Sequence, residues 1–517
     1  MLAGFSPGTS PIRSDLDPTQ SDLIRPNPTN GEKFFREGQR MKNIPCHSII
    51  TWQAAGFAAY RCWPENVLLM LIMNASFLSR LGANFLCFLF LPWVLTLSPG
   101  SAWADSAADR FWPQWRGPLA TGFAPLADPP VSWSETNNIK WKTPVPGEGD
   151  STPIVWDNRI FILSAIDSGK KPAAPVAPNA PDEIYQWVVL CLDRATGKTL
   201  WQKTAREEAP HEGRQENNTF ASASPVTDGK LLLAYFGSRG LHCYDFDGNL
   251  KWEKDFGKMK TRMGFGEGAS PALSGDTVVV NWDTEGDDFI LALNKQTGQE
   301  LWRTPRDEAT GWSTPLILDF NGQKQVIVNA TKKVRSYDLA TGKEIWSCSG
   351  QTANAIPSPV TAGGIIYLTS GFRGNALQAI RLGRTGDLTG SDAIIWSHDK
   401  GTPYVPSPLL AEDYLYVMQN NDAIVSCFNA KSGEEYFDRD RLEAIHGVYA
   451  SPVAARDHVY ILSREGTCVV LQKGPKAEIL AVNKLDDDTH HTDASMALVD
   501  QEAFIRTPHH LYCIARP

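Results

Sequence analysis

The stretch DLATGKEIW at residues 338–346 returns four more times with small changes, and this repetition decides the fold. Each copy opens with Asp or Asn, continues through a Gly, and in four of the five ends on Trp. An Asp or Asn side chain can cap the backbone two residues on, and the Gly supplies the positive φ that a tight hairpin needs. Each copy therefore predicts a turn between two β-strands. The other copies are DRATGKTLW (193–201), DFDGNLKW (245–252), NKQTGQELW (294–302) and NAKSGEEYF (429–437).

A second phrase, Ser-(x)-Pro opening an apolar stretch, precedes each turn and gives the period. Its successive steps are 72, 46, 44, 44, 49, 44 and 44 residues, with Met496 in the last place of the series. The long first step contains a Pro- and Ala-rich run at 170–181, which we interpret as an inserted loop. A step of about 40–50 residues is the size of a four-stranded propeller blade. The prolines are Pro153, Pro225, Pro271, Pro315, Pro359, Pro408 and Pro452.

The repeat predicts an all-β chain folded as an eight-bladed β-propeller, with seven blades as the alternative if one copy has decayed. The last copy ends at the C-terminus after about three strands, so one strand is missing there. The stretch NIKWKTPV (138–145) precedes the first blade and carries Trp141. We expect this N-terminal strand to complete the last blade, which closes the ring and removes exposed sheet edges.

One aromatic residue recurs near the end of most repeats, and we expect this column to pack at the seams between blades. An aromatic ring there buries a large apolar area in every contact between neighbouring blades. Phe437 takes the place in one copy, and residues 477–485 have no such aromatic. The column consists of Trp141, Trp201, Trp252, Trp302, Trp346 and Trp396.

The first 104 residues are predicted to lie outside the propeller. Residues 73–104 have the form of a secretory signal, with Arg80, an apolar run and a small-x-small cleavage site at 102–104. Residues 1–72 precede this signal and show no repeat, so we interpret them as a mis-annotated start or a disordered extension. The domain prediction is thus 1–72 extension, 73–104 signal peptide and 105–517 propeller. The protein is expected to be exported to the periplasm or cell envelope, without a stable transmembrane anchor.

Charge and cysteine content narrow the classes of partner and chemistry. The formal net charge is −9, spread without long runs, so no basic face for nucleic acid or anionic membranes is expected. Six cysteines follow residue 104, and four of them share one strand position, where a free Cys acts as a small buried hydrophobe. Their pairing cannot be deduced from spacing. No GxSxG, P-loop or GxGxxG motif nominates a catalytic residue.

Together the phrases resemble the pyrroloquinoline-quinone (PQQ) type β-propeller repeat, which quinoprotein dehydrogenases share with the outer-membrane assembly lipoprotein BamB. FWPQWRGPLATGF (111–123) is similar to the entry segment of exported propellers of this type, abundant in planctomycete bacteria. Resemblance to the dehydrogenases implies an axial site with an Asp base, Ca²⁺ ligands, a Trp under the quinone and often a vicinal disulfide. The sequence has no adjacent Cys pair and no motif that places the Asp and Ca²⁺ ligands. No cofactor is therefore expected, with PQQ and Ca²⁺ as the alternative.

Residues just before the Ser-(x)-Pro phrases should surround the mouth of the central channel, where propellers commonly bind ligands. They are polar and aromatic, and convergent groups of this kind in a pocket form the default binding hypothesis. The alternative is that they cap strand ends around a water-filled channel. The candidates are Glu148, Asp150, Asn218, Phe220, Glu267, Trp312, Asn354, Tyr404, His446, Tyr449, His491 and Asp493.

Four histidines of the last repeat form a candidate metal site. His490 and His491 precede its first strand, and His509 and His510 lie between its second and third strands. Both loops should open on one face, near Asp493, and imidazole with carboxylate suits Zn²⁺. The alternative is that they are solvated loop histidines.

The sequence thus favours a noncatalytic exported propeller, which we expect to be a monomer, that binds a protein or glycan partner in the cell envelope. The alternatives are a quinoprotein-like oxidoreductase with PQQ and Ca²⁺ at the axis, and a metal-binding sensor module. A closed, Trp-floored axial cavity with a convergent Asp would favour the enzyme, whereas a shallow open mouth would favour the binder.

Overall fold

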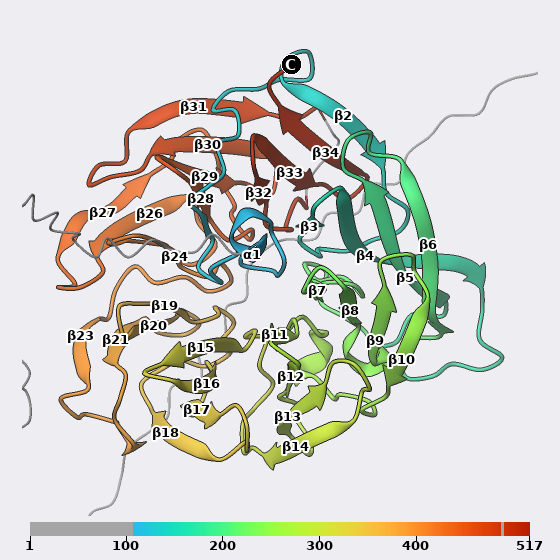
Figure 1. Cartoon of the computed structure of the whole chain (residues 1–517), viewed down its shortest axis with the longest axis horizontal. Coiled ribbons are helices and arrows are strands. Elements are labelled where there is room, and N and C mark those ends of the chain that lie inside the picture. The colour runs from blue at the N-terminus through green and yellow to red at the C-terminus, as the bar shows by residue number, and fades with distance from the viewer. Residues whose placement is uncertain (1–106, 487–490) are drawn as a thin grey trace, which may run out of the picture. The chain divides into compact units, whose positions relative to one another are not determined.

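The computed structural model describes residues 107–486 and 491–517, and they form a ring of eight sheets around a central axis (Figure 1). Each sheet is a four-stranded blade, and two of them carry a short fifth strand at one edge. The eight-bladed all-β prediction is confirmed, and the seven-blade alternative is wrong. Within each blade the four strands run antiparallel, from an inner strand that follows the Ser-(x)-Pro phrase to an outer strand. In blade three, for example, the outer strand follows the Gly turn. The predicted extension (1–72) and signal peptide (73–104) lie outside the described residues.

The strand bounds follow the repeat, blade by blade. Blade one holds β3 (Ile154–Trp156), β4 (Arg159–Lys170), β5 (Ile184–Asp193) and β6 (Thr199–Glu208), and blade two holds β7 (Val226–Thr227), β8 (Leu231–Tyr235), β9 (Leu241–Asp245) and β10 (Leu250–Lys254). Blade three holds β11 (Ala272–Ser274), β12 (Thr277–Trp282), β13 (Phe289–Asn294) and β14 (Glu300–Pro305), and blade four holds β15 (Leu316–Phe320), β16 (Gln323–Val328), β17 (Val334–Asp338) and β18 (Glu344–Cys348). Blade five holds β19 (Val360–Ala362), β20 (Ile365–Ser370), β21 (Ala376–Arg381) and β23 (Ile394–His398), and blade six holds β24 (Leu409–Ala411), β25 (Tyr414–Met418), β26 (Ile424–Asn429) and β27 (Glu435–Arg441).

The remaining elements complete and decorate the ring. Blade seven holds β28 (Val453–Ala455), β29 (His458–Leu462), β30 (Thr467–Gln472) and β31 (Ile479–Lys484), and blade eight holds β32 (Ala497–Val499), β33 (Glu502–Arg506), β34 (His510–Ala515) and β2 (Ile139–Pro144). The short pieces are α1 (Ala107–Arg110), β1 (Phe123–Ala124), β22 (Gly386–Asp387) and two 3-10 turns, η1 (Gly237–Arg239) and η2 (Arg262–Gly264). No helix in the described part of the chain is both long and apolar enough to cross a membrane.

The ring closes through the N-terminal segment, as predicted. Strand β2 is the outermost strand of blade eight and pairs antiparallel with β34, so that Trp141 lies opposite Cys513. Strand β1 adds in parallel to the inner strand of blade seven, pairing Phe123 with Ala454. Residues from both ends of the described chain therefore share the last two blades.

The column of tryptophans packs at the seams between blades, which confirms that prediction. The Trp302 indole donates a hydrogen bond to the Leu339 carbonyl of the next blade (2.8 Å), and a Cβ built on that blade's turn residue Gly342 would meet the indole at 2.4 Å. The same interblade bond is made by four other column residues, Trp141, Trp201, Trp252 and Trp396. Trp346 does not make this bond to the described residues. In blade five a longer loop that carries β22 replaces the tight turn, and β22 pairs with β18, the strand of Trp346.

The repeated strand position of the cysteines has a packing reason. Cys191, Cys243 and Cys427 each lie on the strand directly beside a column aromatic, paired with Trp201, Trp252 and Phe437. A small side chain there leaves room for the ring. All six described cysteines are buried and free, and burial raises the pKa of the Cys191 thiol to about 12.

A belt of hydrogen bonds around the axis explains the Ser-(x)-Pro phrase. The residue just before each Pro donates its backbone N–H to the hydroxyl of the corresponding Ser or Thr in the next blade. Seven such bonds, of 2.9–3.0 Å, run from Thr152 to Ser495. The belt includes Thr152, Ser224, Ser270, Thr314, Ser358, Ser407, Ser451 and Ser495. The phrase thus joins neighbouring blades at their innermost point.

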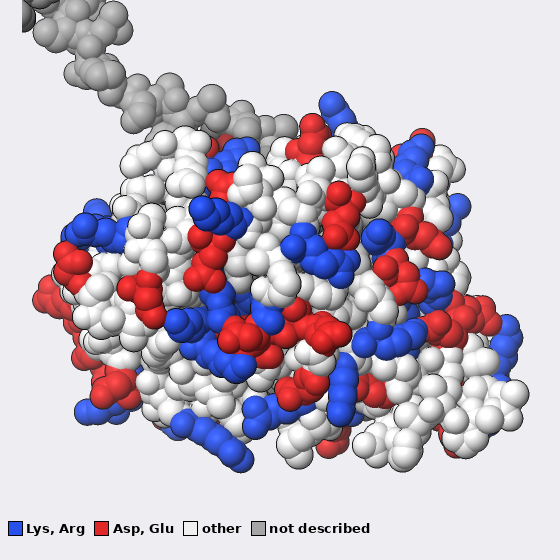
Figure 2. Space-filling model, turned by 90° about the horizontal axis from the view of Figure 1, so that it is seen from below, with Lys and Arg blue, Asp and Glu red and all other residues white. Residues whose placement is uncertain are grey.

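The charged side chains on the outer wall are mixed in sign. Figure 2 shows Lys and Arg interspersed with Asp and Glu over the face it presents, without one large basic area. Partly or fully exposed ion pairs of the described chain include Lys258 with Glu208 and Lys431 with Asp413. This face offers no footprint for a nucleic acid.

Candidate axial binding site

The segment at residues 112–124 crosses the inner ring and closes one end of the channel. Its Trp112 exchanges backbone hydrogen bonds with Val155, the Pro113 carbonyl accepts from Thr227, and the Thr121 carbonyl accepts from Leu410. These partners lie in or just beyond the Ser-(x)-Pro phrase on the inner strands, whereas the predicted mouth residues precede it. The segment therefore plugs the end of the channel opposite the mouth, and it lies over the centre of the ring in Figure 1.

Between the plug and the mouth lies an axial cavity of about 180 Å³. The plug contributes Trp115 to its wall, and the belt contributes four hydroxyls, those of Ser270, Thr314, Ser451 and Ser495. Gln215 and Asn217 add amide groups at the rim. The cavity also brings together six of the twelve predicted mouth residues: Asp150, Asn218, Trp312, Tyr404, Tyr449 and Asp493.

The two carboxylates of this cavity come from the loops leading into blades one and eight. Burial and the nearby negative charge of Asp493 together raise the pKa of Asp150 to about 7, against the opposing effect of Arg506. Asp493 accepts a hydrogen bond from Arg464 Nε at 2.9 Å, yet burial still raises the pKa of its carboxyl group. Two carboxyl groups that disfavour each other's charge can hold a proton between them near neutral pH.

Arg464, on the loop between β29 and β30, organises the mouth beside this pair. Its Nη2 donates to Asn217 (2.9 Å) and contacts His491, and its guanidinium lies over the Tyr449 ring at 4.2 Å from the centroid. The sequence reasoning missed Arg464 because it follows an inner-blade strand rather than a Ser-(x)-Pro phrase. It also missed Trp115, whose only signal was its place in a non-repeating segment ahead of the ring.

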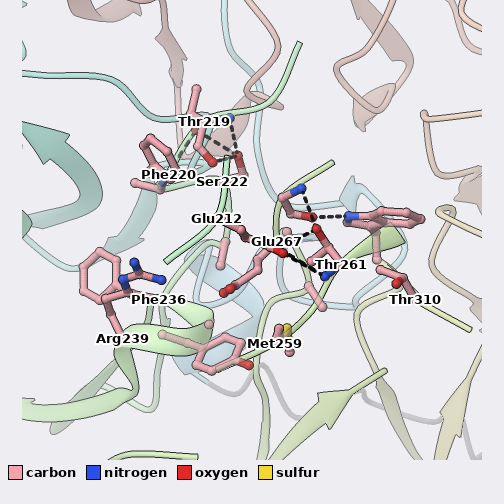
Figure 3. Close-up of a pocket in the computed structure, with 18 of the residues that line it drawn as sticks. Glu212, Thr219, Phe220, Ser222, Phe236, Arg239, Met259, Thr261, Glu267 and Thr310 are labelled. Carbon is pink, nitrogen blue, oxygen red and sulfur yellow. Dashed lines mark hydrogen bonds between the residues drawn. The ribbon is translucent and has the colours of Figure 1, made fainter. Parts of the chain in front are cut away.

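Three of the predicted residues lie around a second pocket, in the seam between blades two and three. It has a volume of about 40 Å³, and Phe220, Glu267 and Trp312 line it. Figure 3 shows Glu212, Glu267 and Thr261 in its middle, with Phe236 and Arg239 to one side. Glu267 accepts hydrogen bonds from the backbone N–H and hydroxyl of Ser238, and burial raises the pKa of its carboxyl group. Trp312 forms part of both pockets.

The other predicted mouth residues stand apart from the axial cavity. Glu148 pairs with Arg214 and accepts a hydrogen bond from the Phe220 backbone, so it orders the loop rather than lining the channel. Asn354 is buried with φ of 53°, and the side chain of His446 is exposed. His491 is exposed beside Arg464.

The proposed histidine cluster is placed only in part. His509 is exposed, and His510 begins β34 with its ring against Tyr512. His490 lies outside the described residues. Among residues 107–486 and 491–517, no group of three or more His, Cys, Asp or Glu side chains could hold a metal ion.

Comparisons with known proteins agree with the repeat. The family model described as outer membrane protein assembly factor BamB matches residues 186–439. The crystal structure of BamB from Moraxella catarrhalis is 14% identical with a TM-score of 0.50, and the alignment covers 73% of this chain and 99% of that one. Quinohemoprotein alcohol dehydrogenase from Comamonas testosteroni is 10% identical with a TM-score of 0.55, covering 80% and 81%. At such identities these likenesses show the fold alone. No curated protein sequence matches the chain.

The axial cavity fits the cofactor of the quinoprotein dehydrogenases poorly. Its indole and its Asp150 carboxyl are the kinds of group that the resemblance implies. An anionic quinone held through Ca²⁺ also needs several oxygen ligands and a positive surrounding, because Ca²⁺ takes six to eight oxygens. The described lining offers two carboxylates, one of them already paired with Arg464. The side-chain oxygens of Asn217 and Asn218 also accept hydrogen bonds already, from Arg464 and from Thr219 and Ser222. No reaction step is therefore derived through PQQ.

Proposed function

We propose that this chain, a β-propeller whose residues 186–439 match the BamB family model, has a noncatalytic role as an exported glycan-binding module of the cell envelope. The observation that carries the proposal is the composition of the axial cavity: an aromatic wall, a ring of hydroxyls and two carboxyl groups in one space of about 180 Å³. In this proposal the cavity takes the terminal sugar of a glycan that enters through the mouth.

The chemistry of the lining suits a ligand that both donates and accepts hydrogen bonds. Each belt hydroxyl that accepts a backbone N–H keeps its own proton to donate, as at Ser270 and Ser495. The carboxylates of Asp150 and Asp493 accept from sugar hydroxyls, and the rim amides do both. Aromatic faces such as those of Trp115 and Trp312 give apolar contact to the C–H faces of a sugar ring.

Cavity shape favours the glycan over the protein among the partners that the sequence leaves open. A stable protein interface buries roughly 1,600 Å² in total, most of it over convex or flat surface. The axial cavity is instead a concave space that would enclose a single small group, as ligand sites do. A protein partner that inserts one side chain is the competing outcome of the test.

Calorimetric titration of the purified chain tests the proposal directly. Neutral oligosaccharides are expected to bind saturably. Two single variants of the cavity, Asp150→Asn and Trp115→Ala, should each weaken this binding by at least ten-fold. Asp440→Asn, at an exposed outer-strand position, is the matched control and should bind as the wild type does. Binding of envelope peptides but not of oligosaccharides would overturn the glycan assignment, and binding unaffected by both cavity variants would overturn the site.

A quinoprotein-like oxidoreductase is the second candidate, because one observation favours it. Asp150 has a carboxyl pKa of about 7 in a cavity that contains Trp115, and a carboxylate titrating near neutrality is suited to act as a general base. Binding of PQQ in the presence of Ca²⁺ would support this candidate over the first.

A further inference from the structure

Arg116 is the residue through which the plug is fixed to the ring. Its side chain is only 3% exposed, and its Nη2 donates to the carbonyls of Pro408 (2.9 Å) and Pro452 (3.0 Å), at blades six and seven. The guanidinium also lies so close to Gly122 that a Cβ there would be 2.2 Å from Nη2. One nitrogen of the guanidinium is thus fully used by the backbone.

The rest of this guanidinium has no partner in the described part of the chain. Its Nε and Nη1 are buried and lack any hydrogen-bond acceptor among the described residues, and no described carboxylate lies within ion-pair distance. Burial lowers the pKa of Arg116 to about 9, so the group keeps its charge at neutral pH. A buried charge that is neither paired nor fully hydrogen-bonded is strongly unfavourable.

A small cavity of about 20 Å³ lies against Arg116 and against the belt. Its lining includes Thr314 and Ser358, whose hydroxyls accept the backbone N–H of Ser270 (3.0 Å) and Thr314 (2.9 Å). Each of these hydroxyls still has its own proton to donate. A single water molecule needs roughly 10–15 Å³ of cavity space. The cavity therefore holds one or two atoms of that size.

We propose that this cavity is a binding site for a single chloride-sized anion, held by Arg116 Nε and Nη1 and by the hydroxyls of Thr314 and Ser358. The lining side chains Arg116, Thr314 and Ser358 can each point a donor inward, and the amide of Gln114 can turn its N–H groups inward as well, which suits an anion. A water molecule would satisfy the donors but leave the positive charge uncompensated. Most oxyanions need more than one atom's width of space, whereas a halide does not.

The anion would complete the attachment of the plug. Arg116 holds the plug to blades six and seven through Nη2, while Thr314 and Ser358 belong to blades four and five. An anion between them therefore links the plug to the two preceding blades of the ring as well. Trp115 and Thr314 line both this cavity and the axial one, so the anion also supports the wall of the axial cavity.

Crystals of the full chain grown in bromide in place of chloride give the direct test. An anomalous peak within hydrogen-bonding distance of Arg116 Nε or Nη1 is the expected result. A cavity without anomalous signal, in crystals where Arg116 is well ordered, would overturn the proposal.

Thermal unfolding in solution supplies the second measurement. At constant ionic strength, replacing gluconate by chloride should raise the Tm and the rise should saturate, because a ligand that binds only the folded state stabilises it. Arg116→Met should abolish this chloride dependence. Ser358→Ala should weaken the apparent chloride affinity about ten-fold, as expected for losing one hydrogen bond to a charged group.

Ser224→Ala is the matched control, because Ser224 accepts the same belt hydrogen bond (2.9 Å) but does not line the cavity. It should lower the Tm while keeping the full chloride response. An equal chloride response in the wild type and Arg116→Met would instead assign the effect to the surface and contradict the site. The measurement does not depend on any glycan, so it stands apart from the proposed function.

Discussion

The backbone N–H of Trp133 donates a hydrogen bond of 2.8 Å to Asn483 Oδ1, which joins the segment ahead of the first blade to the outer strand of blade seven. The Asn483 amide returns a bond of 2.9 Å to the Val131 carbonyl. In this blade Ala481 pairs with Val470 beside the bulge, at the register position that Trp302 holds in blade three. Trp133 is buried in the same core cluster and supplies the aromatic that blade seven lacks.

Trp133→Ala should therefore destabilise the protein as a loss from the core. The expected cost is about 3–5 kcal/mol in the free energy of unfolding, the range for deleting a large buried aromatic. Urea denaturation measures it, with Leu119→Ala at an exposed position of the plug as a control that should change stability little.

A chain that begins at Gly147 lacks the whole closing segment and should melt at a much lower temperature. Unchanged melting would refute closure of the ring by this segment.

Trp302→Ala tests the column at an ordinary seam. We expect a loss of about 3–5 kcal/mol, because the ring packs against Gly342 and its N–H bonds to Leu339. Trp302→Phe keeps a ring but removes the donor, so it should cost less, about 1–3 kcal/mol. Leu301→Ala, next in sequence and 48% exposed, is the control expected near zero. Equal effects of the Ala and Phe variants would contradict the packing argument.

The repeat phrases allowed the fold to be predicted because each residue type in them is required by the local geometry of a turn. Asp338 accepts hydrogen bonds from the Thr341 backbone and hydroxyl, and Gly342 has a φ of 71°, as the turn reasoning required. Such needs recur with the period, so they are visible in one sequence.

The site was harder to predict because its parts do not recur. Asp150 and Asp493 were identified from their position before a repeat phrase, and the ring brings them together as adjacent blades eight and one. Trp115 and Arg116 belong to a segment without any repeat, and only the closed ring shows that it crosses the channel. Glu148 was predicted to lie at the mouth because of its position in the sequence. In the structure it forms an ion pair with Arg214 and orders the loop instead.

The carboxyl pair should make stability depend on pH in a defined direction. The folded-state pKa of Asp150 is raised from its ordinary 3.8 to about 7, so the folded protein binds a proton more tightly than the unfolded chain. Its contribution to stability is present below about pH 4 and is lost as the pH rises through 7. Asp150→Asn, which cannot ionise, should flatten this part of the curve of unfolding free energy against pH. A wild-type curve that rises from pH 4.5 to 7.5 more steeply than the variant's would contradict the assignment.

Removing the two hydroxyls of Ser224 and Thr152, in neighbouring blades of the belt, should change the free energy of unfolding by different amounts. Ser224→Ala leaves the buried N–H of Thr152 without its acceptor and should cost about 1–3 kcal/mol. Thr152→Val should be close to neutral, because the Thr152 hydroxyl is buried without a partner among the described residues and Val has nearly its shape. Chemical denaturation of the two variants measures the difference. Equal losses of stability would contradict this and would mean that the Thr152 hydroxyl also accepts a belt hydrogen bond.

Titration of PQQ with Ca²⁺ into the full chain decides between the two candidate functions. We expect no saturable heat, because the cavity offers two carboxyl groups and one of them is engaged by Arg464. Asp493→Asn provides an internal check: if Ca²⁺ bridges the quinone to this pair, the variant should lose whatever binding the wild type has. Saturable binding that Asp493→Asn removes would replace the glycan proposal with the oxidoreductase. Binding that the variant retains would place the quinone outside the axial cavity and leave the glycan proposal to be judged by its own titration.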